Sequence, residues 1–223
     1  MKDLLLTSAF PRPSRDLAIN FTLLTEEILN QEIIHHLLEI KGQCRGLALI
    51  DNLAFIKSRE AEGGLQRLEK TMTEAGYPFR CRDIKPMNFY PVGLEAVILL
   101  AIKKAFNYSD EKFEEVGSIN ARQSLVVRLF AKYFVSLKKV LSEAQKMWNR
   151  YYTVGRLDPV ELDEKERRII LKVEGFKTHP LHCQVLKGYF SEVVKMIVVS
   201  SAVCQETKCP FRGDNHHEFV ISW

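Results

Sequence analysis

The sequence predicts an α+β fold in which an N-terminal helical half packs on a C-terminal antiparallel sheet. Apolar residues recur at helical spacing as far as about residue 151, and the pattern changes to short β-branched runs after Gly155. These runs flank one more helical segment, so the expected order is strand-strand-helix-strand-strand. With 223 residues, of which 46% are hydrophobic, the chain can bury a core, which excludes a disordered, collagen-like or disulfide-stapled protein.

The first part of the chain, residues 1–40, is expected to be a leader followed by a helical arm. Pro11 and Pro13 punctuate the first 16 residues, and apolar residues then recur at mostly helical spacing as far as Gly42. We expect one domain over residues 41–223. The arm exposes so much apolar surface in this interpretation that a homodimer is predicted to cover it.

The helical half continues with several short amphipathic segments. Helical spacing predicts a helix over residues 47–56 and another over 65–72 that ends near Gly76. Further helices are expected over the segments 92–106 and 109–116, the second broken by Gly117, and a long central helix over 121–151.

The C-terminal half is expected to form the sheet. Residues 160–162 and 169–173 flank a charged turn and predict a hairpin. Helical spacing returns over residues 182–200, and alternating patterns predict two last strands over 198–204 and 217–223.

Charge and cysteine content narrow the possible partners and location. A net charge of +4 is too small to indicate a nucleic-acid partner. The five cysteines are an odd number and no secretion signal is evident, which favours a reducing cytoplasm. The most apolar stretch, residues 193–204, is too short to span a membrane.

One cluster near the C-terminus has the residue types of a metal site. Thiolate and imidazole groups suit zinc, and six candidates fall within 35 residues: Cys183, Cys204, Glu206, Cys209, His216 and His217. The alternative is that the cysteines are small buried hydrophobic residues and the histidines lie at a solvated strand edge. The spacing by itself matches no standard zinc finger.

The same region resembles the end of the 4-vinyl reductase domain. The matching positions are Cys183, Gly188 and Tyr189, Glu206, Cys209, Gly213 and Asp214, and the segment 217–219. That domain belongs with the haem-nitric-oxide-binding sensor fold and the Bet-type TRAPP tethering subunits. The resemblance implies a structural Zn²⁺ ion held by Cys183, Glu206, Cys209 and His217, with His217 where the family has cysteine.

The resemblance also implies a cavity for a small hydrophobic or aromatic ligand between the sheet and the aromatic-rich helix. The candidate ligand-binding residues are Phe130, Phe134, Trp148, Tyr151, Tyr152 and Cys204. The alternative is that this aromatic stripe is ordinary core.

These observations predict a non-enzymatic, zinc-containing sensor that reports ligand binding to a downstream protein partner. No serine-hydrolase elbow or phosphate-binding loop is present. One alternative is a scaffold subunit resembling the TRAPP tethers. Others are a haem-binding gas sensor, although the Tyr-x-Ser-x-Arg signature is missing, and a reductase accessory protein, which rests on the family name alone.

Overall fold

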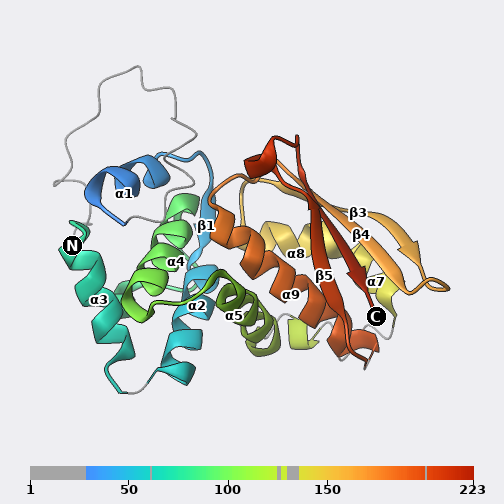
Figure 1. Ribbon diagram of the computed structural model, residues 1–223, viewed down its shortest axis with the longest axis horizontal. Coiled ribbons are helices and arrows are strands. Elements are labelled where there is room, and N and C mark those ends of the chain that lie inside the picture. The colour runs from blue at the N-terminus through green and yellow to red at the C-terminus, as the bar shows by residue number, and fades with distance from the viewer. Residues whose placement is uncertain (1–28, 61, 125–126, 130–135, 199) are drawn as a thin grey trace.

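The computed structural model describes residues 29–60, 62–124, 127–129, 136–198 and 200–223. The fold is α+β, as the sequence predicts. Helices fill one side of the molecule, and a four-stranded antiparallel sheet lies on the other side, with helix α9 between them (Figure 1).

The helical half is built around one helix that is buried on nearly all sides. Helix α4 (Val92–Phe106) is apolar on most of its surface apart from Glu95 and two lysines in its last turn, which is the pattern of a helix enclosed by others. Its C-terminus is set by Asn107, which adopts a left-handed conformation with φ of 53°. The elements packed on it include α1 (Gln31–Leu38), α2 (Gly46–Arg59), α3 (Gly64–Glu74), α9 (Pro180–Val198) and the short antiparallel pair β1 (Gln43–Arg45) and β2 (Phe89–Pro91). The 3-10 turn η2 (Cys81–Asp83) lies between α3 and β2, and α5 (Asp110–Gln123) follows α4 in the chain.

The described part of the predicted arm belongs to this core. Helix α1 begins at Asn30, whose side chain accepts a hydrogen bond from the Ile33 amide. Ile33 and Leu37 are almost fully buried, and α1 packs on α4. Residues 1–28 lie outside the described residues, so the boundary between an arm and a domain near residue 40 stays a prediction.

The predicted continuous helix over residues 121–151 is wrong. Helix α5 ends at Gln123, and two short helices follow later, α7 (Leu137–Ser142) and α8 (Ala144–Tyr151). The Ser136 side chain accepts a hydrogen bond from the Lys139 amide, so it caps a new helix where the apolar spacing indicated helix interior. The spacing of apolar residues does not indicate where a polar side chain accepts a hydrogen bond from the backbone and starts a new helix.

Helix α5 does not end at Gly117 but runs through it, because this glycine lies where α5 meets α9 (Pro180–Val198). A Cβ atom at Gly117 would lie 1.9 Å from the Val185 carbonyl oxygen. A Cβ atom at Gly188 would lie 1.8 Å from the Glu114 carbonyl oxygen. The two glycines therefore allow the backbones of α5 and α9 to approach closely, and this is the most extensive contact between two helices.

The main sheet has the strand order β3-β4-β6-β5, with all neighbours antiparallel. Alternate residues of β4 and β6, among them Ile169 and Phe219, are buried beneath α9. The predicted strand over 198–204 is displaced: α9 continues to Val198, because its apolar face extends over residues that also alternate. The strands are β3 (Arg156–Asp163), β4 (Arg168–Glu174), β5 (Val203–Lys208) and β6 (His217–Ser222), with the 3-10 turn η3 (Pro210–Arg212) between the last two.

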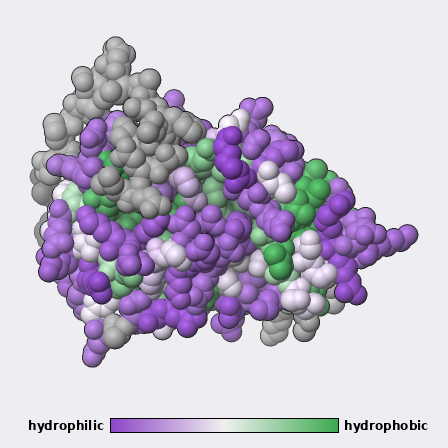
Figure 2. All heavy atoms as spheres, in the orientation of Figure 1, coloured by the Kyte–Doolittle hydropathy of each residue, from purple (hydrophilic) through white to green (hydrophobic). Residues whose placement is uncertain are grey.

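The face of the molecule shown in Figure 2 is mostly hydrophilic, and a prominent apolar area lies on the side occupied by the sheet. Val160 on β3 and Val203 on β5 are the most exposed valines described. Within the described ranges, no helix combines the length and apolar character that a membrane crossing requires.

We expect Gly117→Ala to destabilise the protein by about 2–4 kcal/mol, although alanine favours an isolated helix, because the added methyl group forces α5 away from α9. Gly188→Ala tests the same contact from the other helix and should have a comparable effect. Urea unfolding measures both, and an unchanged or higher midpoint would contradict this account of the contact.

Candidate functional site

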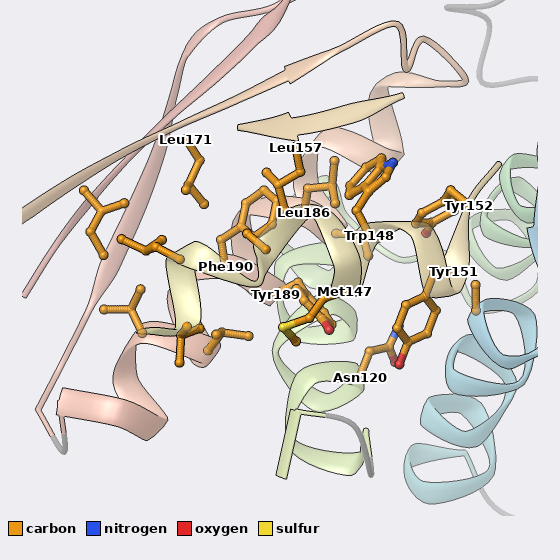
Figure 3. A pocket seen from close by; sticks show the side chains of 18 of the residues that line it. Asn120, Met147, Trp148, Tyr151, Tyr152, Leu157, Leu171, Leu186, Tyr189 and Phe190 are labelled. Carbon is orange, nitrogen blue, oxygen red and sulfur yellow. The ribbon is translucent and has the colours of Figure 1, made fainter. Parts of the chain in front are cut away.

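A cavity of about 110 Å³ lies between the helical half and the sheet. Its walls come from α7, α8, α9, β3 and β4, and residues of α2, α4 and α5 line one end (Figure 3). The wall is almost wholly apolar, with side chains such as Leu157, Leu186 and Phe190 directed inward. Such a cavity favours an apolar guest, because a water molecule inside would lack hydrogen-bond partners over most of the wall.

The structure brings together only some of the predicted ligand-binding residues. Trp148, Tyr151 and Tyr152 line the cavity. Phe130 and Phe134 lie outside the described residues. Cys204 on β5 is buried in the core and is not among the residues that line the cavity.

The aromatic wall is held in place by specific contacts. The Trp148 indole nitrogen donates a hydrogen bond of 2.9 Å to the Val154 carbonyl oxygen. Its ring lies 4.8 Å from the Tyr152 ring and 4.9 Å from the Phe176 ring, between centroids. These contacts restrict the rings to one arrangement and so give this wall a defined shape.

One end of the cavity carries a buried polar network that the sequence-based interpretation missed. The Glu95 side chain on α4 accepts hydrogen bonds from Asn52 Nδ2, at 3.2 Å, and from the Tyr152 hydroxyl, at 3.0 Å. A glutamate inside the otherwise apolar run 92–102 was the signal that could have found it, because a buried carboxylate requires partners.

His182 on α9 lies beside this network. Its Nδ1 atom is 2.8 Å from the Thr178 hydroxyl oxygen. Its Nε2 atom is 3.3 Å from Glu95 Oε1 but is not in hydrogen-bond geometry with it, so this buried nitrogen has no hydrogen-bond partner among the described residues. The residue His182 is 2% exposed, and an unsatisfied polar atom at this depth is unusual in a folded protein.

Asp51 on α2 lines the same end of the cavity. Burial, and then the charge of Glu95, raise the pKa of Asp51 to about 7. The carboxyl group has no hydrogen bond or ion pair within the part of the chain that the structure describes. Two carboxyl groups from different helices thus face one apolar cavity.

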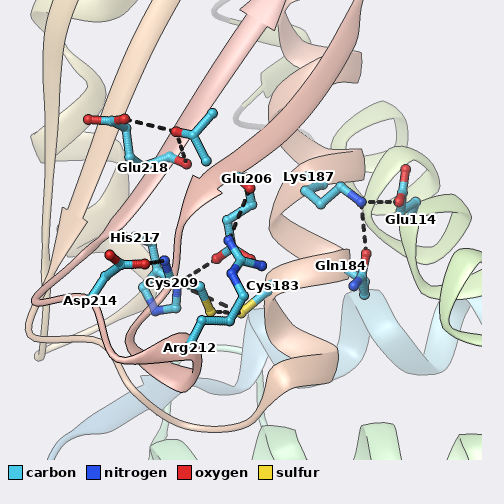
Figure 4. A network of polar contacts seen from close by, with 11 residues as sticks. Glu114, Cys183, Gln184, Lys187, Glu206, Cys209, Arg212, Asp214, His217 and Glu218 are labelled. Atoms are coloured by element: carbon cyan, nitrogen blue, oxygen red, sulfur yellow. Dashed lines mark hydrogen bonds and ion pairs between the residues drawn. The ribbon is translucent and has the colours of Figure 1, made fainter.

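The four predicted metal ligands also converge, around the first turn of α9. One ligand atom from each of Cys183, Glu206, Cys209 and His217 lies within 4.8 Å of the other three. The two sulfur atoms are 3.8 Å apart, and Cys183 Sγ is 3.7 Å from His217 Nδ1 (Figure 4). The cluster joins the start of α9 to β5 and β6.

Hydrogen bonds within the protein satisfy both nitrogens of His217. Its Nδ1 atom is 2.8 Å from Glu206 Oε1, and its Nε2 atom is 2.7 Å from the Phe176 carbonyl oxygen. Burial opposes protonation, but hydrogen bonds with Cys209, Glu206 and Phe176 raise the pKa of His217 to about 9.

The two thiols of the cluster differ in acidity. The hydrogen bond with Cys209, and then burial, raise the pKa of Cys183, whereas the hydrogen bond with Cys183 lowers the pKa of Cys209. Cys209 is therefore the thiol that carries negative charge more readily. His216, the other candidate of the region, is absent from this group of four.

No family model and no curated protein matches the sequence. Forty-two chains of solved structures do match. An H-NOX protein from S. oneidensis, described in the Fe(II)NO ligation state, has a TM-score of 0.61 and 10% identity, and the match covers 80% of this chain and 98% of that one.

Two further H-NOX structures lead to the same conclusion. A Tt H-NOX variant has a TM-score of 0.58 and 14% identity, with 80% of this chain and 94% of that chain covered. An unliganded Fe(II) H-NOX mutant from K. algicida has a TM-score of 0.58 and 14% identity, with 80% and 95% covered. At these identities the likeness shows the fold, so the chain shares the fold of H-NOX domains.

The prediction of structural Zn²⁺ as the cofactor is wrong. Structures of the same fold are described by Fe(II) ligation and haem distortion, not by zinc. The cluster of Cys183, Glu206, Cys209 and His217 is no evidence for zinc, because hydrogen bonds among these groups account for their convergence. That these four residues ligate a metal ion stays a prediction.

We expect His217→Ala to lower the free energy of unfolding by about 2–4 kcal/mol, because it leaves the buried Phe176 carbonyl and the Glu206 carboxylate without this partner. His216→Ala is the matched control, since it removes the same side chain one residue away from the cluster. Denaturant unfolding of both variants compares them, and equal stabilities would contradict the assigned role of His217.

Asp51 should make the protein less stable as the pH rises from about 4 to about 7. Its pKa in the folded state lies above its ordinary value, so its contribution is fully present below about pH 4 and is lost as the carboxyl group ionises. We expect Asp51→Asn to remove this part of the pH dependence and to be more stable than the wild type above pH 7, by about 2 kcal/mol after allowance for partial exposure. Thermal unfolding across this pH range measures the difference, and parallel profiles for the two proteins would contradict it.

Proposed function

We propose that this protein is a non-enzymatic binding domain for a small, mainly apolar ligand, and that it acts as a sensor. The observation that carries the proposal is the cavity beside α9, whose wall is apolar except at one end. A packed core leaves few voids larger than a water molecule, so a preformed void of this size favours a binding role over ordinary core.

The volume restricts the size of the ligand. An engineered protein cavity of about 150 Å³ binds benzene, so a cavity of about 110 Å³ suits a guest of roughly one ring or a short alkyl group. Trp148 and the neighbouring tyrosines offer faces and edges for contact with a planar guest.

Haem is named in the description of an H-NOX structure of the same fold, but it does not fit this cavity. A porphyrin is far larger than a guest of one ring. His182 is the histidine among the described lining residues, and its Nε2 atom faces Glu95 rather than open space for an iron atom. The described residues thus support a ligand other than haem.

Helix α9 offers a route by which binding can be reported. His182 lines the cavity, and the next residue, Cys183, belongs to the polar cluster that holds α9 to β5 and β6. A ligand that displaces the start of α9 would therefore disturb this cluster. We propose that a downstream protein partner responds to ligand binding. We also propose that the protein forms a homodimer and belongs to the 4-vinyl reductase and TRAPP lineage.

The five cysteines are all free, and each is buried or half-buried. Free thiols persist in a reducing compartment, so we propose a cytoplasmic location. A scaffold role resembling the TRAPP tethers is the competing function, in which contacts with proteins take the place of ligand binding.

The test uses benzyl alcohol, a neutral probe of one ring. We expect it to bind the wild type with a calorimetric signal and to raise the unfolding temperature. Val194→Phe fills the cavity from α9 and should weaken binding by at least ~10-fold, with little loss of stability because it occupies a void.

Val203→Phe is the matched control, because Val203 is exposed on β5 and does not line the cavity. It should bind benzyl alcohol as the wild type does. Equal binding by Val194→Phe and the wild type, or no binding by either, would overturn the proposal. So would a stoichiometric haem absorption band in protein purified with haem supplied.

A further inference from the structure

The polar end of the cavity has an excess of acidic over basic side chains. Among the described residues that line the cavity, Asp51 and Glu95 are the acidic ones, and neither lysine nor arginine occurs. The two carboxyl groups interact, since the charge of Glu95 is one cause of the raised pKa of Asp51. No lysine or arginine of the described lining compensates these two carboxyl groups, and the basic side chain beside them is His182, whose Nε2 atom is 3.3 Å from Glu95 Oε1.

Glu95 is positioned toward the cavity by fixed donors. Asn52 donates to one oxygen atom and Tyr152 to the other, so the carboxylate cannot rotate freely. An ionised carboxylate accepts about four hydrogen bonds. The two protein donors leave acceptor capacity on each oxygen, and the unsatisfied Nε2 atom of His182 lies beside one of them.

Aromatic rings surround the same end. Tyr151 and Tyr189 are close enough to Asp51 that its charge contributes to raising their pKa values, after burial. Figure 3 shows Tyr151 and Tyr152 together at the end of the cavity where Asn120 lies. Ring faces attract cations, and the attraction is stronger in a site shielded from water.

We infer that the ligand of this cavity is a small organic cation, an ammonium group on a short aryl or alkyl body, whose charged end is bound between Asp51 and Glu95. The inference rests on the proposed ligand-binding function and specifies its ligand class. The ammonium group donates to free lone pairs of the two carboxylates, and the body occupies the apolar part of the cavity beside Leu186 and Phe190.

A neutral or anionic ligand is favoured less by the same groups. A neutral guest provides no countercharge for the two carboxyl groups, and an anion is repelled by the negative charge that they carry when ionised. The cation provides the missing countercharge, so its binding should also lower the pKa of Asp51.

The test compares three probes of similar shape and different charge on the intact protein: benzylamine, benzyl alcohol and benzoate. We expect benzylamine to bind at least ~10-fold more tightly than benzyl alcohol, and benzoate to bind least, by calorimetry. Asp51→Asn and Glu95→Gln should each reduce the preference for benzylamine to less than about threefold while benzyl alcohol still binds. That retained binding shows that the variants are folded.

Glu74→Gln is the control, because Glu74 is exposed on α3 and pairs only with Lys70 among its described ion pairs. It should keep the full preference for benzylamine. Binding of benzylamine should also weaken as the pH falls from about 8 to about 6, since Asp51 gains its proton while the amine stays charged. The titratable and charged groups around Asp51 are Glu95, Tyr151, Tyr189 and His182, with exposed Arg150 beside Tyr151.

The outcomes separate this inference from the proposed function. Equal binding of benzylamine and benzyl alcohol would overturn the cation inference and leave the ligand-binding function in place. A preference for benzylamine that persists in Asp51→Asn and in Glu95→Gln would also overturn it, because the charge selection would then arise elsewhere. No binding of any probe would overturn both.

Discussion

The close contact between α5 and α9 is the constraint on which the rest of the structure depends. Gly117 and Gly188 let each backbone approach the carbonyl oxygens of the other helix. This contact places α9 between the helical half and the sheet. One face of α9 then lines the cavity and its first turn enters the polar cluster, so the positions of both sites follow from one helix.

The cavity joins two environments that are costly to combine. Its apolar wall disfavours charge, yet the side chains of Asp51 and Glu95 line the same cavity. Neighbouring donors partly offset the cost for Glu95, whereas the Asp51 carboxyl group responds through a raised pKa. A carboxyl group with a strongly raised pKa in a cavity marks a candidate functional site, and Asp51 is such a group.

The polar cluster at the start of α9 is a separate structural feature. Cys183 comes from the helix, Cys209 follows β5 and His217 begins β6, so their hydrogen bonds tie together segments that are distant in sequence. Cys183 follows His182, a residue of the cavity wall, so the cluster and the cavity share the first turn of α9. A structural change in the polar cluster is therefore expected to alter the cavity wall, and a change in the wall to alter the cluster.

The sequence by itself determined the α+β class and the strand-strand-helix-strand-strand order, because periodicity is a local property. Residue type and spacing left six candidates for the C-terminal cluster, and the family resemblance reduced them to the four that converge. Only the tertiary structure decided that the helix expected over 121–151 is interrupted, since Ser136 caps a new helix. The tertiary structure also decided the composition of the cavity, because Asp51, Glu95 and His182 lie on three helices far apart in sequence. Spacing within one helix reports neighbours three or four residues away, whereas the meeting of these side chains depends on how the helices pack.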